Sequence, residues 1–190
     1  MADLPIILFE TEEALEKWLE ENYATSQGFW LKIAKKGTGH TSLQYAEALN
    51  VALCYGWIDG QKGKLDEQFW LQKFTPRRAK SVWSRVNTEK VAALIEQGKM
   101  REPGLKEIER AKADGRWDAA YESQSRITVP DDFQAALNEN PAAKEFYERL
   151  NSANRYAILF RITTAKKEET RKKNIQKFID MLNAGEKLHN

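Results

Sequence analysis

The sequence predicts an α+β fold: a small antiparallel sheet of about three strands packed with helices, followed by a small all-helical module. Segments rich in β-branched and aromatic residues occur only in the first half of the chain, whereas helical periodicity dominates after Pro130. A polar stretch, residues 118–129, separates the two and is typical of a linker. We therefore expect an α+β domain over residues 1–122 and a helical module over residues 123–190.

Composition places the chain among ordinary globular proteins. It has 190 residues, of which 42% are hydrophobic and 31% charged. A single cysteine, Cys54, rules out an internal disulfide, and two histidines are too few for a structural zinc site, so neither a metal nor a cofactor is expected. No apolar run approaches the roughly 20 residues that span a bilayer, and no signal peptide is recognisable, so we expect a cytoplasmic protein without membrane insertion.

The first predicted helix begins after Thr11, a residue type that caps helices. Two glutamates occupy its first turn, and Leu15, Trp18 and Leu19 form an apolar stripe at helical spacing. We expect this helix to end near Asn22.

Three segments are predicted strands. Residues 28–35 alternate apolar and other side chains, with Phe29, Leu31 and Ile33 on one face. Residues 57–62 and 68–75 are joined by a short polar segment and predict an antiparallel hairpin.

The remaining helices of the first domain are predicted from caps and breakers. Thr41 and Gln44 form a capping-box pair ahead of a helix that ends at Gly56. A second helix is expected to begin at Asn87 or Thr88.

A further helix starts near Pro103, with Leu105, Ile108 and Ala111 facing inward. Beyond Pro130 the spacing of apolar residues predicts three or four amphipathic helices. His189 lies almost at the end of the chain, where disorder is expected.

Charge is unevenly distributed although the net charge is only +2. Residues 1–25 carry seven acids against one lysine, and residues 151–190 carry nine bases against four acids. On a helix Glu168 would face Lys172 and Glu169 would face Lys173, which favours a solvated, ion-paired helix. Binding of nucleic acid or another polyanion by these basic helices is the weaker alternative.

Candidate chemistry is concentrated between Cys54 and Asn87, where aromatic and polar residues occur together. Strand alternation places Trp57, Asp59 and Gln61 on one face. The Asp59 carboxylate could pair with an arginine of the following loop, contact a ligand, or act as an acid or base.

The second half of this stretch is basic. Residues 73–90 carry an excess of five positive charges, which favours an anionic ligand held by arginine, with serine and asparagine contacts and Trp83 as a stacking face. The alternative is an exposed loop in which Trp83 anchors against the core and Asn87 caps a helix. The predicted ligand-binding residues are Tyr55, Trp57, Asp59, Gln61, Arg77, Ser81, Trp83, Ser84 and Asn87.

Two other features have simpler interpretations. Cys54 sits late in an apolar helix, so burial is favoured over a nucleophilic role, although His40 could approach it in space. Residues 37–39 lie between a strand and a helix but lack the phosphate-loop pattern, so a plain turn is expected.

Several motifs together resemble the YdeI/OmpD-associated family. They are residues 52–60, 74–77, 81–84 and 87, then 98–100 and 115–117, and in the C-terminal module Pro130, Phe133, Phe146, Glu169, Arg171, Ile175 and Leu182. The resemblance implies that the C-terminal module is the small helical module of that family. Arg161 stands where that family usually has tryptophan, and Asn174 where it usually has arginine.

The resemblance implies a role in bacteriocin or antimicrobial-peptide resistance in bacteria, without an established reaction. We therefore expect a protein that binds a small anionic ligand, a peptide or a partner. One alternative is an enzyme in which Asp59 is the acid or base for a small anionic substrate; it lacks a recognisable nucleophile, metal set or cofactor loop. The other is a nucleic-acid or protein-binding module that uses the basic C-terminal helices.

Overall fold

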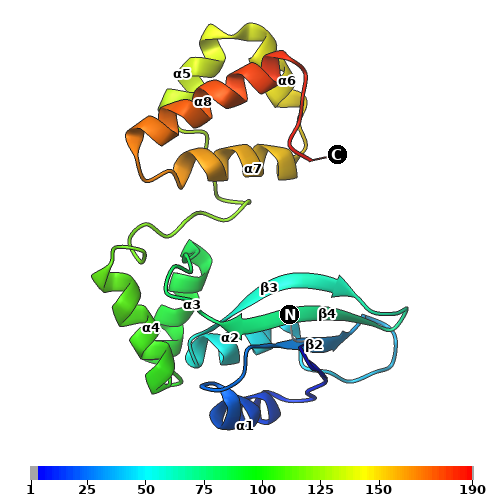
Figure 1. The fold of residues 1–190 in the computed structure, drawn as a ribbon. Coiled ribbons are helices and arrows are strands. Elements are labelled where there is room, and N and C mark those ends of the chain that lie inside the picture. The colour runs from blue at the N-terminus through cyan, green and yellow to red at the C-terminus, as the bar shows by residue number, and fades with distance from the viewer. Residues whose placement is uncertain (1–3, 190) are drawn as a thin grey trace. The chain divides into compact units, whose positions relative to one another are not determined.

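The computed structural model describes residues 4–189, which form two compact units (Figure 1). The first unit ends at Asp118, and the second comprises Ala119 onward together with the short segment Trp83–Val86. The first contains a sheet and helices, and the second is built on helices. This confirms the predicted α+β class, while the exact boundary at residue 122 stays a prediction.

The sheet of the first unit has four strands in the described residues: β1 (Ile6–Ile7), β2 (Phe29–Ala34), β3 (Trp57–Lys64) and β4 (Phe69–Pro76). Their order is β1-β2-β4-β3. The predicted hairpin is confirmed, since β3 and β4 pair antiparallel, as do β2 and β4. β1 was not predicted and pairs parallel with β2, which makes the sheet mixed; a two-residue strand has too little alternation to be recognised.

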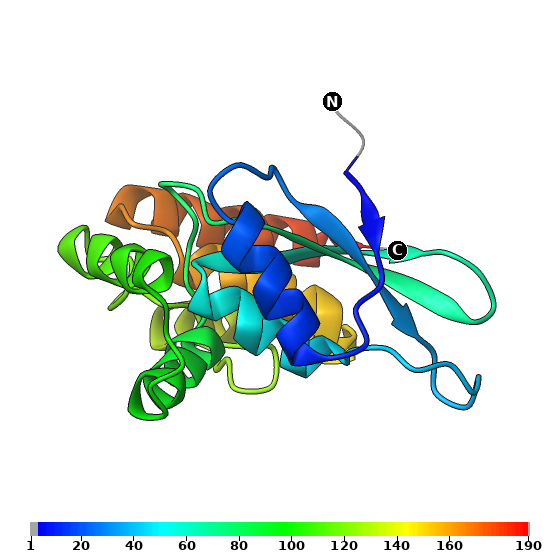
Figure 2. The ribbon, with the colours of Figure 1, turned by 90° about the horizontal axis from the view of Figure 1, so that it is seen from below.

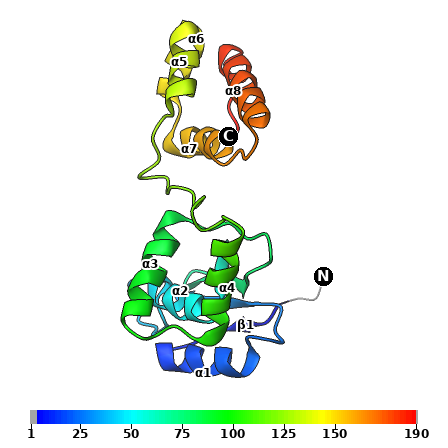
Figure 3. The ribbon, with the colours of Figure 1, turned by 90° about the vertical axis from the view of Figure 1, so that its left-hand side faces the viewer.

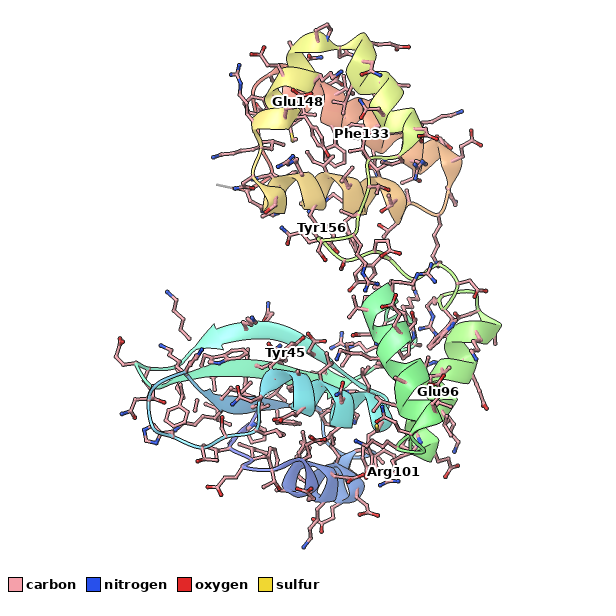
Figure 4. The ribbon with its side chains drawn as sticks, turned by 180° about the vertical axis from the view of Figure 1, so that it is seen from behind. Tyr45, Glu96, Arg101, Phe133, Glu148 and Tyr156 are labelled. Atoms are coloured by element: carbon pink, nitrogen blue, oxygen red, sulfur yellow. The ribbon has the colours of Figure 1, made fainter. Side chains whose placement is uncertain are left out.

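Two helices, α1 (Glu12–Asn22) and α2 (Tyr45–Cys54), cover one face of this sheet. Figure 4 shows α2 in front of the strands, and Figure 2 shows α1 beside α2. Aromatic rings fill the space between: Phe29 stacks on Phe74 with 5.7 Å between centroids, and Trp18 meets Phe29 edge-on at 4.9 Å. We call this the helix-covered face and the opposite side the open face.

The starts of both helices show how local sequence sets the fold. The Thr11 hydroxyl accepts a hydrogen bond from the Ala14 amide at 3.2 Å, which confirms the predicted cap. At α2 the predicted pair was wrong: the capping box is formed by Gln44 and Glu47, and the Gln44 amide donates to Glu47 Oε2 at 2.9 Å. The helix therefore starts one turn later than the Thr41 pattern indicates.

Two more helices complete the first unit, α3 (Arg85–Glu96) and α4 (Glu102–Ala113). α3 begins before Asn87, so the predicted cap there was wrong. In α4, Ile108 is buried as predicted, but Leu105 is 40% exposed. α4 approaches α2 closely because Gly104 has no side chain: a Cβ there would lie 2.2 Å from the Cys54 carbonyl oxygen.

The second unit contains four helices in its described part: α5 (Asp131–Glu139), α6 (Pro141–Arg149), α7 (Ser152–Thr163) and α8 (Glu168–Asn183). Figure 3 shows α5 and α6 on one side, α8 on the other and α7 across the end between them. This confirms the predicted helical module. Its core contains Phe133, Leu137, Tyr147, Ile158, Ile162, Phe178 and Leu182.

Polar contacts link separate segments of this helical unit. Arg171 pairs with Asp132 through two hydrogen bonds of 2.6 and 2.9 Å, and these bonds lower the pKa of the Asp132 carboxyl. The Asn154 side chain bonds both backbone groups of His189, at 2.8 and 3.1 Å. The expectation of disorder at His189 was therefore wrong, because a buried asparagine holds the end of the chain.

Candidate functional site

The two segments predicted to form a site are neighbours in the sheet. Trp57 lies opposite Pro76, and the Arg77 amide donates to the Gly56 carbonyl at 3.0 Å. The hairpin therefore brings the Asp59 strand beside the start of the basic loop. The side chains of the two segments have different environments, which are described in turn.

Trp57 belongs to the core of the helix-covered face. It is 1% exposed, meets Trp18 edge-on at 5.9 Å and donates its indole N–H to the Tyr23 carbonyl at 3.3 Å. These contacts satisfy the indole in the protein interior and give it a packing role.

Asp59 faces the same helices and accepts a hydrogen bond from the Tyr45 hydroxyl at 2.8 Å. A β-bulge follows it, because the four residues from Asp59 to Lys62 lie opposite only three residues of β4, Gln72 to Phe74. Lys62 therefore takes the place that strict alternation gives to Gln61, and its ammonium lies 5.0 Å from the Trp70 ring. Gln61 is exposed.

The basic loop bonds to its own backbone. Arg77 is buried and donates through Nη1 to the Val82 carbonyl at 3.1 Å. Arg116 donates to the Ser81 carbonyl at 2.7 Å, and the Ser81 hydroxyl accepts from the Arg78 amide at 2.9 Å. Two of the predicted anion-binding side chains thus help to hold the loop in shape.

The remaining members of the predicted set follow this loop. The Trp83 carbonyl accepts from the Tyr121 amide at 3.0 Å, and Ser84 forms a parallel bridge with Tyr121. Asn87 is buried in the first turn of α3. A shared ligand site for the nine residues stays a prediction.

Tyr55, one of the nine predicted ligand-binding residues, contacts Arg101, which lines a separate cavity. Burial raises the pKa of the Tyr55 hydroxyl, and Arg101 hydrogen-bonds the same side chain. Arg101 also pairs with Glu16 of α1. Figure 4 shows Arg101 beside that helix. The arginine therefore links the end of α2 to α1 at the edge of the cavity.

This cavity, about 250 Å³, lies among the helices of the first unit, and we call it the helical cavity. Its lining combines an apolar floor with charged residues at the rim. The lining residues are Glu12, Glu13, Glu16, Asn50, Val51, Cys54, Leu94, Gly98, Lys99 and Arg101.

The floor and the rim offer different contacts. Val51, Cys54 and Leu94 are buried and provide apolar surface. Glu16 is engaged by Arg101, which leaves the carboxylates of Glu12 and Glu13 as acceptors at the rim. Hydrogen bonds from its own backbone amide and from the Thr11 hydroxyl lower the pKa of Glu13, so it is ionised at neutral pH.

Cys54 is unsuited to nucleophilic chemistry in this position. Burial, with a smaller contribution from Glu16, raises the pKa of its thiol to about 11. A thiol with that pKa is almost entirely protonated at neutral pH and reacts slowly.

The sequence motifs did not identify this cavity, because its residues come from three separated segments. The sequence feature that could have indicated the cavity is the pair of glutamates in the first turn of α1. Their negative charge is visible in the sequence, but no ligand for it is. Among residues 4–189 no group of three histidine, cysteine or acidic side chains is arranged to hold a metal. No helix in that range has the length and apolarity needed to cross a membrane.

Two family models match the chain. Residues 7–107, more than half of the chain, match the family described as Domain of unknown function (DUF8412), and residues 126–185 match the family described as Bacteriocin-protection, YdeI or OmpD-Associated (OmdA). The chain therefore belongs to the DUF8412 family, and its C-terminal unit carries the match to the OmdA family. The helical cavity and all nine predicted site residues fall within the DUF8412 match, and the OmdA match spans α5 to α8. No curated protein and no solved structure matches the chain.

Arg161 and Asn174, the two residues that depart from the family's usual pattern, lie in the C-terminal unit that matches OmdA. Asn174 of α8 donates to the Arg161 carbonyl at 2.8 Å, and Arg161 donates to the Ala157 carbonyl at 2.7 Å. The two residues are therefore in contact where α7 meets α8. The predicted ion pairs of α8 are confirmed, Glu168 with Lys172 and Glu169 with Lys173, each at 2.8 Å.

Proposed function

We propose that this OmdA-family protein is a binding protein for basic peptides and that it contributes to antimicrobial-peptide or stress resistance in the bacterial cytoplasm. The observation that carries the proposal is the helical cavity, where two rim carboxylates stand beside an apolar floor. A lysine or arginine side chain has the complementary construction, because a long apolar stem ends in a cation.

The charges around the cavity favour a cationic ligand. Three of its ten lining residues are glutamates of α1, against Lys99 and Arg101, so the lining has a net charge of −1, and Arg101 pairs with Glu16. Glu10, Glu20 and Glu21 extend the acidic character beyond the cavity. Basic peptides would be attracted to this helix over a range set by salt screening.

The family description gives the biological direction. One of the two matching families is described as bacteriocin-protection, and antimicrobial peptides are commonly rich in basic residues. Binding by the first unit would retain such a peptide. Binding of a small anionic ligand by the Asp59 and Arg77 segments is a separate proposal. It is supported by the proximity of those segments in the hairpin.

The experiment is a calorimetric titration of the whole protein with an amidated peptide of alternating lysine and leucine. We expect E12Q/E13Q to weaken binding at least tenfold, because it removes both rim carboxylates. The matched control is E20Q/E21Q, which changes the charge of the same helix equally outside the cavity and should alter affinity less than twofold. Equal losses in the two variants, or no binding by the native protein, would refute the cavity as the site.

A cellular test addresses the role. A strain that lacks the protein should regain survival under antimicrobial peptide when it expresses the native chain or E20Q/E21Q, but not E12Q/E13Q at equal abundance. Full protection by E12Q/E13Q would show that resistance does not depend on the helical cavity.

A further inference from the structure

The open face of the sheet combines aromatic rings with lysines. Side chains along a strand alternate between the two faces of the sheet. The open face therefore carries every second residue, and the residues between them point to α1 and α2. Its principal members are Ile6, Trp30, Lys32, Phe69, Leu71 and Lys73. Ile6 is 52% exposed, and Trp30, Lys32 and Lys73 are partly exposed. Figure 4, seen from behind, shows α2 on the other side of the strands.

Each aromatic position on this face has an ammonium group beside it. Lys32 Nζ lies 4.0 Å from the centre of the Phe69 ring, and Lys73 Nζ lies 5.8 Å from the Trp30 ring. The exposed His40 ring lies over Phe69, with 4.9 Å between centroids. The arrangement of a ring next to a cation thus occurs twice on this face, on neighbouring strands.

Glycine lets the indole pack closely on the neighbouring strand. A Cβ at Gly63 would lie 3.4 Å from Trp30 Cζ3, and a Cβ at Gly60 would lie 3.7 Å from the Cβ of Lys73. β3 contributes no side chain at these two positions. The Trp30 ring therefore packs over the β3 backbone at Gly63 and stays partly exposed.

The charge of the strands is one-sided. Across the four strands the only acid is Asp59, and it faces the helices, where Tyr45 bonds it. The strands carry four lysines, of which Lys32 and Lys73 lie on the open face. The strands add no opposing carboxylate there, and the acid that acts on Lys32 from the adjoining β3–β4 turn is Asp66.

We propose that the open face binds single-stranded nucleic acid, a function beyond the peptide binding proposed above. Bases stack on Trp30 and on the His40 ring that Phe69 supports, and phosphates bind Lys32 and Lys73. Trp30 and Phe69 are four residue positions apart along the strands, roughly 13 Å at the usual rise, so they serve different nucleotides.

Single-stranded nucleic acid fits this surface better than an acidic protein does. Its repeating unit is a planar base beside a phosphate, which matches the repeated ring beside an ammonium. An acidic peptide would use the two lysines and leave the rings without a role. The lysines of α8 are a weaker candidate, because Lys172 and Lys173 already pair with glutamates.

The test is fluorescence anisotropy of labelled 12-nucleotide dT and U strands with the full chain, at 50 and 200 mM salt. We expect binding that weakens with salt and a loss of about tenfold or more in K32A/K73A. W30A should lose about fivefold or more, as expected for removal of one stacking platform, and W30F should restore most of the affinity. Preference for dT or for U would identify the kind of strand.

The matched control is K62A/K64A, which removes two lysines of the same sheet on the helix-covered side and should change affinity less than twofold. Circular dichroism establishes that each variant is folded. Equal losses in the two double variants would show diffuse attraction and overturn the proposal. An unaltered affinity in a folded W30A, or no binding at 50 mM salt, would also overturn it.

Discussion

The two faces of the sheet use the same residue types for different purposes. On the helix-covered face, Trp57 is 1% exposed and meets the Trp18 ring. On the open face, Trp30 is partly exposed and lies beside the Lys73 ammonium. The difference teaches that a tryptophan in a strand is not a functional signal until the fold shows which face it occupies.

The largest expected effect separates the two tryptophans. Trp57→Ala should lower the free energy of unfolding by about 3–5 kcal/mol, because it leaves a cavity in the aromatic core. Trp30→Ala should cost less, about 1–2 kcal/mol, since part of its ring is in solvent already. Urea unfolding followed by circular dichroism measures both. Similar losses would contradict the assignment of core and open face.

A pair of glycine substitutions tests packing on the two sides. Gly104→Ala places a Cβ against the Cys54 carbonyl of α2, a backbone atom that moves little, and should cost about 1–3 kcal/mol. Gly63→Ala meets only side chains, at 3.3 Å or more, and should cost less than about 1 kcal/mol. Thermal unfolding compares them, and a larger loss for Gly63→Ala would reverse the ranking.

Single polar groups should differ less. Tyr45→Phe removes the hydroxyl that bonds Asp59 and should cost about 0.5–1.5 kcal/mol. Lys73→Ala on the open face should change stability by less than about 0.5 kcal/mol, as is usual for a solvated cation. If Tyr45→Phe proves neutral in urea unfolding, the carboxylate does not depend on that bond.

The smallest effect concerns Cys54, the last residue of α2. Because its pKa is raised to about 11, the folded protein keeps the thiol protonated through neutral pH, and the contribution of this group to stability is lost only as the pH rises from about 9 through 11. We expect very slow reaction with a disulfide reagent at pH 7.5 and rapid reaction in denaturant. Equally rapid labelling of the folded chain would show that the thiol is accessible.

Local signals in the sequence predicted most elements correctly. The Thr11 cap, the β3–β4 hairpin and the four C-terminal helices each depend on contacts within a few residues. β1 was missed because its pairing comes from a distant strand. The bulge after Asp59 was missed because alternation gives no warning of an extra residue.

The candidate site was harder to predict for a physical reason. Aromatic and polar residues crowded between Cys54 and Asn87 suggested a pocket, yet Trp57 and Arg77 there are buried. The helical cavity gathers residues from Glu12 to Arg101, and the open face joins β2 to β4. Such sites arise from tertiary placement, which no single motif records.

The most direct test of the difference between the two faces is a nuclear magnetic resonance titration of the full chain, labelled with ¹⁵N, with 12-nucleotide dT. We expect shift changes centred on Trp30, Lys32 and Lys73, with the Trp30 indole signal among the largest and the Trp57 indole signal almost unmoved. Shifts concentrated on α8, or equal changes at the two indoles, would contradict this expectation.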